Sequence, residues 1–199
     1  MPKIKISPSS LLLFAGILLS ENKILSLSVF ICATIHEIGH FIAAALLKIK
    51  IKCFHLNVCG AKIIPEAQIC SYGKEFMLCF CGPLANVITL ILFSPTTNIS
   101  SYVSIENIDA HTYIVLFSAL LSVINLLPIK SLDGGRMLFC ILSWAFGQRA
   151  ANTFLNITTF LFALLIWMLS VYLLILSRGG IVFFSFSLCM FLKIFEKST

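Results

Sequence analysis

The chain has 199 residues, of which 59% are hydrophobic and 11% carry a charge, and its mean hydropathy is +1.04. This composition lies far outside that of soluble globular domains and is typical of a protein embedded in a bilayer. The net charge of +6 does not indicate nucleic-acid binding, because the 14 Lys and Arg residues lie between apolar runs, where membrane topology explains them. We therefore expect a multi-pass integral membrane protein, in contact with lipid and without a nucleic-acid partner.

Six apolar stretches approach or exceed the roughly 20 residues that a spanning helix needs. They lie at about Ile6 to Ser20, Ile24 to Leu47, Glu75 to Phe93, His111 to Pro128, Asn152 to Leu176 and Ile181 to Phe195. Residues 48–65 differ, since apolar residues occupy every second position and then shift by one before Gly60. That pattern predicts a strand with a bulge, followed by a turn. The predicted fold is an all-α polytopic membrane protein with about six transmembrane helices and a short membrane-associated β element between the second and third.

Charges around the first stretch and between the spans predict the orientation. Lys3 and Lys5 precede an apolar run as in a signal peptide, but no small-residue cleavage site follows, so we expect a retained first span. With a cytosolic amino terminus, 12 of the 14 Lys and Arg residues lie on the cytosolic side, and only Lys23 and Arg178 lie outside. Both termini are therefore expected to be cytosolic.

The second predicted span contains three ionisable residues, His36, Glu37 and His40, in the sequence HEIGH. A charged group near a span centre costs about 2.5 to 3.5 kcal/mol on insertion scales, so these residues require a reason. Residues four apart share a helix face, so both imidazoles can bind one metal ion, and Glu37 can reach a water on it. The composition predicts on the order of 0.002 chance matches to such a motif. HEIGH therefore indicates a catalytic zinc site, although it does not choose the substrate.

A second group of polar residues closes the fourth predicted span, from Asn125 to Gly135. Pro128 is expected to stop or kink the helix, and Gly134 and Gly135 to permit backbone geometry that other residues resist. They follow Asp133, one of only two aspartates in the chain. Two histidines leave a hydrolytic zinc one protein ligand short, so Asp133 is the candidate third ligand.

Together these motifs resemble the site-2 protease family of intramembrane zinc metalloproteases, peptidase family M50. HEIGH matches the HExxH of that family, the segment from Asn125 to Gly135 matches its NxxPxxxLDG pattern, and CGPLANV is similar to its GPxxN segment. Six spans with HExxH on the second are similar to the branch that contains stage IV sporulation protein FB. Members of that branch commonly carry a CBS domain after the last span, whereas this sequence ends at Thr199. The resemblance therefore does not imply control by ATP through such a domain.

The resemblance implies a Zn²⁺ cofactor and a set of site residues. The implied zinc ligands are His36, His40 and Asp133. Glu37 is the implied general base. Asn125 is expected to hydrogen-bond the substrate backbone or a developing oxyanion, with a helix-packing amide as the alternative. Asn86 of the GPxxN segment is also assigned to substrate binding.

The predicted function is that of a zinc endopeptidase, built as one domain over residues 1–199 with its catalytic core at about 24–147. It would hydrolyse a peptide bond in or next to a membrane-associated segment of a substrate protein near the cytosolic face, as in processing of a sporulation sigma-factor precursor. The implied partners are that substrate and membrane protein regulators, and the implied location is a bacterial cell or forespore membrane. Two alternatives remain open. One is another membrane zincin whose third ligand is Glu66 or Glu75, and the other is a non-catalytic membrane zinc binder or transporter.

Overall fold

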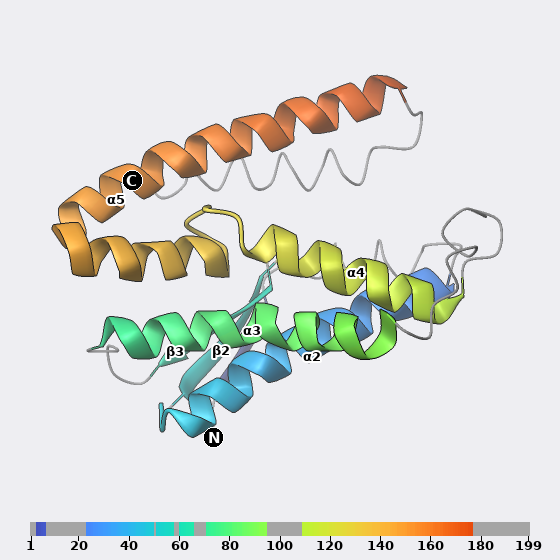
Figure 1. Ribbon diagram of the computed structural model, residues 1–199, viewed down its shortest axis with the longest axis horizontal. Coiled ribbons are helices and arrows are strands. Elements are labelled where there is room, and N and C mark those ends of the chain that lie inside the picture. Colours follow the sequence, from blue (N-terminus) through green and yellow to red (C-terminus); the bar gives the residue numbers. More distant parts are fainter. Residues whose placement is uncertain are drawn as a thin grey trace. The chain divides into compact units, whose positions relative to one another are not determined.

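The computed structural model describes residues 3–6, 23–49, 51–57, 60–65, 71–94 and 109–176. The chain forms two compact units, Met1–Leu126 and Leu127–Thr199. Figure 1 shows the elements that make up each unit. The first unit contains a small sheet and three helices, and the second contains a turn and the long element α5.

The helix that carries HEIGH is α2, Lys23–Leu46. Its end is defined by the backbone of Lys48, which has a φ of 55° and is the one non-glycine residue with positive φ in the described part of the chain. The amide of Ile49 donates to the carbonyl of Ala44 at 2.9 Å, and the amide of Lys48 donates to that of Ala45 at 3.1 Å. This pair of bonds is the Schellman arrangement, which satisfies the last carbonyls of a helix. It turns the chain out of α2 and towards the sheet.

Three strands form the sheet of the first unit, in the order β1-β2-β3. β1 (Lys3–Ile6) is parallel to β2 (Ile51–Asn57), and β2 is antiparallel to β3 (Gly60–Pro65). The region expected to hold a bulged strand and a turn thus holds two paired strands, with a register irregularity between Ile51 and Cys53. Strand β1 was not expected from the sequence, whose first predicted transmembrane span begins at Ile6.

The other two helices of the first unit are α3, Tyr72–Phe93, and α4, Ala110–Asn125. They contact α2 and one another. A Cβ at Gly39 of α2 would overlap the carbonyl oxygen of Cys81 and lie 2.9 Å from Cβ of Ala85, so the backbones of α2 and α3 are almost in contact. Small residues permit such close approach between helices in a membrane. The close approach brings side chains of α2 within hydrogen-bonding distance of α3.

The second unit begins with a tight turn. α4 ends at Asn125, three residues before Pro128, as expected of a helix that meets a proline. Two threonines of α5 hold this turn. The amide of Lys130 donates to Oγ1 of Thr159 at 2.9 Å, and Oγ1 of Thr158 donates to the carbonyl of Pro128 at 3.1 Å.

α5 (Asp133–Leu176) consists of two helical segments separated by Gly147, which has φ 83° and ψ 161°. Glycine is the residue that adopts this backbone conformation readily. The expectation for Gly134 and Gly135 is wrong in this respect, because neither has a positive φ. Gly135 is needed for space instead, since a Cβ there would overlap the carbonyl of Ile129.

Three of the described helices are long and apolar enough to cross a membrane: α2, α3 and α5. α4 is apolar but has only 16 residues, so it is shorter than the expected fourth span. Large apolar side chains are exposed on these helices, including Leu46 at 78% and Leu92 at 67%, as suits surfaces that face lipid. The expected last span, and the expected first span apart from Ile6, lie outside the described residues, and the orientation of the termini stays a prediction.

Candidate metal centre

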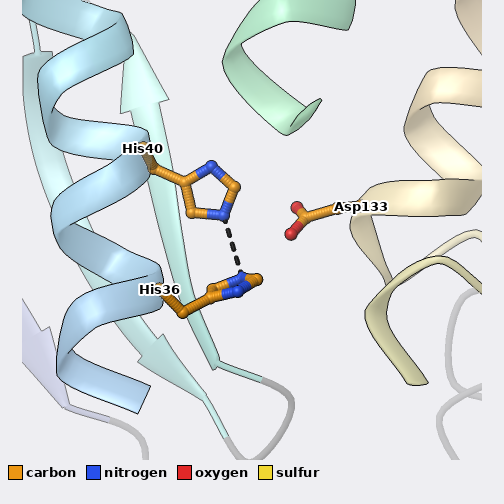
Figure 2. A group of neighbouring side chains, drawn as sticks. All are labelled: His36, His40 and Asp133. Atoms are coloured by element: carbon orange, nitrogen blue, oxygen red, sulfur yellow. Dashed lines mark hydrogen bonds between the residues drawn. The ribbon is translucent and has the colours of Figure 1, made fainter. Parts of the chain in front are cut away.

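The two histidines of HEIGH converge on one point beside α2. Their spacing of four residues places both rings on the same helix face. Both side chains are buried, with exposures of 5% for His36 and 6% for His40. Their Nε2 atoms lie 3.1 Å apart, and the rings meet edge to face, as Figure 2 shows. The far nitrogen of each ring is therefore the one available to partners on other elements.

The Nδ1 atom of His40 has a partner on α3. It lies 2.7 Å from the carbonyl oxygen of Leu78. A carbonyl oxygen can only accept, so Nδ1 of His40 carries a hydrogen, and in the neutral ring Nε2 then presents a lone pair. This is the protonation state that a metal-binding imidazole requires.

The Nδ1 atom of His36 also has a partner on α3, the side-chain amide of Asn86. Nδ2 of Asn86 lies 3.2 Å from Nδ1 of His36, and Asn86 is completely buried. Leu78 and Asn86 are eight residues apart, so two turns of α3 separate the partners of the two rings. The two helices run antiparallel along this contact, since the later residue of α3 meets the earlier histidine.

Gly82, midway between these two partners on α3, leaves room for the imidazoles. A Cβ at this position would overlap the ring of His40 and lie 2.9 Å from Cε1 of His36. In the GPxxN segment, the glycine is therefore needed to leave space for the imidazoles, and the asparagine makes a polar contact with one of them. Pro83, which follows Gly82, is fully buried. Its carbonyl accepts a hydrogen bond from Oγ of Ser122 of α4 at 3.4 Å.

The remaining predicted site residues lie on several elements. Glu37 follows His36 on α2 and is half-buried. Asp133 is the first residue of α5 in the second unit and is also half-buried. Asn125 is buried near the end of α4, where its Nδ2 donates to the carbonyl of Leu121 at 3.0 Å. This bond stays within α4 and decides neither interpretation, so a contact with substrate stays a prediction for Asn125 and Asn86, and the helix-packing alternative for Asn125 stays open.

The described part of the chain contains one group of candidate metal ligands, and its members are His36, His40 and Asp133. The glutamates proposed for another zincin are not in it. Glu75 lies in the first turn of α3, and Glu66 lies outside the described residues. The described candidates are thus the set that the sequence motifs predict.

Comparisons with known proteins agree with these motifs. The family model for peptidase family M50 matches residues 94–169, which contain the segment from Asn125 to Gly135. Stage IV sporulation protein FB of Bacillus subtilis (strain 168) is 30% identical over 161 residues, which are 78% of this chain and 54% of that protein. Residues 94–169 are thus similar to peptidase family M50. The chain spans about half the length of the sporulation protein that it matches.

The fold of the chain has a counterpart among solved structures. It matches the site-2 protease from Methanocaldococcus jannaschii with a TM-score of 0.71 and 22% identity, over 98% of this chain and 90% of that one. The match shows the fold of the chain, whose described part contains three helices long and apolar enough to cross a membrane. The expected resemblance to site-2 proteases is confirmed.

The geometry of the His36 and His40 pair fits a zinc ion. Two nitrogen ligands of a tetrahedral zinc, each at about 2.0 to 2.1 Å, lie about 3.3 Å apart. The two Nε2 atoms are separated by 3.1 Å, close to that value. Both rings are also held at Nδ1 by outer partners, as is usual for metal-binding histidines. Donor type, spacing and outer hydrogen bonds therefore all suit zinc.

Proposed function

We propose that this chain is an intramembrane zinc endopeptidase that hydrolyses a peptide bond in or beside a membrane-associated segment of a protein. The observation that carries the proposal is the buried pair of imidazoles on an apolar helix, with Nε2 atoms 3.1 Å apart and a glutamate next to one of them. A buried polar group in a membrane helix is costly and usually serves a function. A closed structural site is the weaker explanation, because a carboxylate beside two imidazole ligands is the arrangement of a catalytic site.

Each residue has a distinct part in the proposed hydrolysis. His36 and His40 would bind zinc through Nε2, and Asp133 would supply the third protein ligand through a carboxylate oxygen. A bound zinc ion supplies a Lewis acid that polarises the scissile carbonyl and makes water more acidic. Glu37 would take a proton from the attacking water and deliver it to the leaving amide nitrogen, so that water is added across the C–N bond.

The assignment of Asp133 draws on its place in the second unit. It opens α5 directly after the turn that Thr158 and Thr159 hold, so its backbone is anchored. Ligands on anchored backbone keep their geometry better than ligands on loops. The M50 pattern places its aspartate at the same motif position, and a carboxylate suits the third position of a hydrolytic zinc.

The substrate class is proposed from the relatives. Stage IV sporulation protein FB is a sporulation protein by name. We place this chain in regulated proteolysis of the same kind, with a membrane-associated sigma-factor precursor as the candidate substrate. The membrane would be that of a bacterial cell or forespore, with cleavage near the cytosolic face. Strand β3, which lies at an edge of the sheet, would hold an extended substrate by strand addition, a common mode of peptide recognition.

Three variants of the full chain test the proposal, each co-expressed with epitope-tagged sigma-factor precursors and single-span membrane proteins. Glu37→Gln should abolish cleavage and retain most of the metal, because a proton carrier is lost and no ligand is. Asp133→Ala should lose both metal and cleavage. Asp109→Ala is the matched control, since Asp109 is exposed and its side chain makes no capping hydrogen bond. Metal content is measured on purified protein in detergent.

The outcomes separate the alternatives. Cleavage that persists in Glu37→Gln would overturn Glu37 as the general base, whereas zinc binding or transport without cleavage in the wild type would favour a zinc binder or transporter. Full metal content in Asp133→Ala, combined with loss of metal in Glu66→Ala or Glu75→Ala, would show that another zincin arrangement is present.

A further inference from the structure

The amide of Asn86 is the most unusual polar group of the first unit. Asn86 is completely buried on an apolar helix, yet the structure gives it a single hydrogen bond, the one to Nδ1 of His36. Its Oδ1 is buried without a hydrogen-bond partner among the described residues. Leaving a buried polar group without a partner costs about 1 to 3 kcal/mol. A polar side chain kept at this position despite that cost requires an explanation, and its one side-chain hydrogen bond is to a histidine ring.

The protons of the His36 and His40 pair allow two arrangements. In the first, Nδ2 of Asn86 donates to Nδ1 of His36, so the hydrogen of the neutral His36 ring lies on Nε2 and points at Nε2 of His40. In that arrangement the two Nε2 atoms form a hydrogen bond with each other and need no metal. The hydrogen on Nε2 of His36 prevents that atom from binding a metal ion. In the second, the amide is turned over, and Oδ1 of Asn86 accepts from Nδ1 of His36.

The second arrangement leaves a lone pair on both Nε2 atoms. His40 already has its hydrogen on Nδ1, because that atom donates to the carbonyl of Leu78. Two lone pairs 3.1 Å apart repel each other unless a cation lies between them. The oxygen and nitrogen ends of an amide have nearly the same shape, so turning the group over requires no movement of α3.

We propose that Asn86 is a positioning residue, whose Oδ1 accepts the Nδ1 hydrogen of His36 in the metal-bound protein and thereby keeps Nε2 of His36 free to bind the ion. This inference rests on the proposed zinc site and adds a requirement to it. Leu78, Gly82 and Asn86 follow one another at intervals of four on α3, so they lie on one face of that helix. That face fixes the tautomers of both histidines, with a backbone carbonyl for His40 and a side-chain amide for His36.

The experiment compares two replacements of Asn86 that differ in what they can accept. Asn86→Asp keeps an acceptor opposite Nδ1 of His36, whereas Asn86→Leu is of similar size and has none. Thr89→Val is the control, because Thr89 is buried one turn further along α3 and its hydroxyl bonds only to its own helix, at Ala85. Affinities for Zn²⁺ and Co²⁺ are measured on the full chain in detergent by competition with a chelator. The Co²⁺ absorption spectrum reports the geometry of the site.

Loss of an outer partner of a metal-binding histidine typically lowers metal affinity by 10- to 100-fold. Asn86→Leu should show a loss of this size, while Asn86→Asp and Thr89→Val should stay within a few-fold of wild type. In zinc-loaded protein labelled with ¹⁵N-histidine, the hydrogen of His36 should lie on Nδ1, and it should be less well localised in Asn86→Leu.

Three results would overturn the inference: unchanged affinity in Asn86→Leu, equal losses in Asn86→Asp and Asn86→Leu, or a hydrogen on Nε2 of His36 in the zinc-loaded wild type. Each of these leaves the proposed function intact if wild type binds zinc and Glu37→Gln is inactive. Failure of the wild type to bind either metal would instead refute the zinc site itself.

Discussion

Adding one methyl group at Gly82 tests whether α3 shapes the metal centre. In Gly82→Ala the new Cβ would overlap the imidazole of His40 and lie 2.9 Å from Cε1 of His36, so at least one ring must move. Overpacking of this kind costs about 1 to 3 kcal/mol. If this cost destabilises only the state in which both imidazoles are positioned to bind the metal, metal affinity drops by about 5- to 150-fold. This conversion uses about 1.4 kcal/mol per factor of ten.

Gly73→Ala, in the first turn of the same helix, is the matched control. A Cβ at Gly73 meets only Oγ of Ser71, at an ordinary 3.7 Å. Alanine also has a better helix propensity than glycine, by up to about 1 kcal/mol, so this variant should bind zinc normally and be no less stable. The assay is chelator competition on purified full-length protein, with thermal unfolding in the same detergent. Equal zinc affinity for Gly82→Ala and Gly73→Ala would refute the argument that the GPxxN glycine makes room for the histidines.

Two further variants test the second unit. Gly147→Ala should lower the free energy of unfolding by about 1 to 3 kcal/mol, because φ 83° and ψ 161° suit only glycine and a Cβ there would contact nothing that could compensate. An unchanged midpoint of thermal unfolding would contradict the break in α5. Thr159→Val removes the acceptor for the amide of Lys130 and should cost about 1 to 3 kcal/mol, whereas Thr153→Val, whose hydroxyl bonds only to its own helix at Arg149, should cost less than half as much. Equal unfolding midpoints for the two threonine variants would show that the turn is held by other contacts.

The sequence predicted the histidine pair well because that geometry is local. Residues four apart on a helix meet regardless of what surrounds the helix, so HEIGH alone placed the rings of His36 and His40 together. The end of α4 before Pro128 was also predictable, since proline disfavours helical geometry at the preceding residue, although α3 continues through Pro83.

The partners of the histidines were not predictable from the sequence, because they depend on how α2 and α3 are placed against each other. The carbonyl of Leu78 is a backbone group and carries no sequence signal at all. Asn86 had a signal in the GPxxN segment, but the motif does not say whether its amide faces substrate or a ligand. The structure places it against Nδ1 of His36.

The roles of the glycines could not be predicted from the local sequence alone. Backbone geometry that other residues resist was expected at Gly134 and Gly135, yet neither has a positive φ, and Gly135 is needed because the carbonyl of Ile129 comes too close for a side chain. The positive φ occurs at Gly147, where a glycine between aromatic residues and the polar Gln148 and Arg149 could have indicated a break. β1 was missed although Lys3 to Ile6 alternates in the period of a strand, because the apolar run that follows favoured a span.

These contacts give the three motifs of the chain different physical roles. HEIGH supplies two nitrogen ligands, but a helix by itself leaves each imidazole free to choose its tautomer and to rotate about its side-chain bonds. α3 removes that freedom, since Gly82 lies against both rings while Leu78 and Asn86 hold their Nδ1 atoms. When a ligand side chain is already held in its binding geometry, less conformational entropy is lost on metal binding. Substitutions on α3 should therefore weaken zinc binding even though this helix contributes no ligand. That result would distinguish a metal centre that depends on helix packing from one that depends on HEIGH alone.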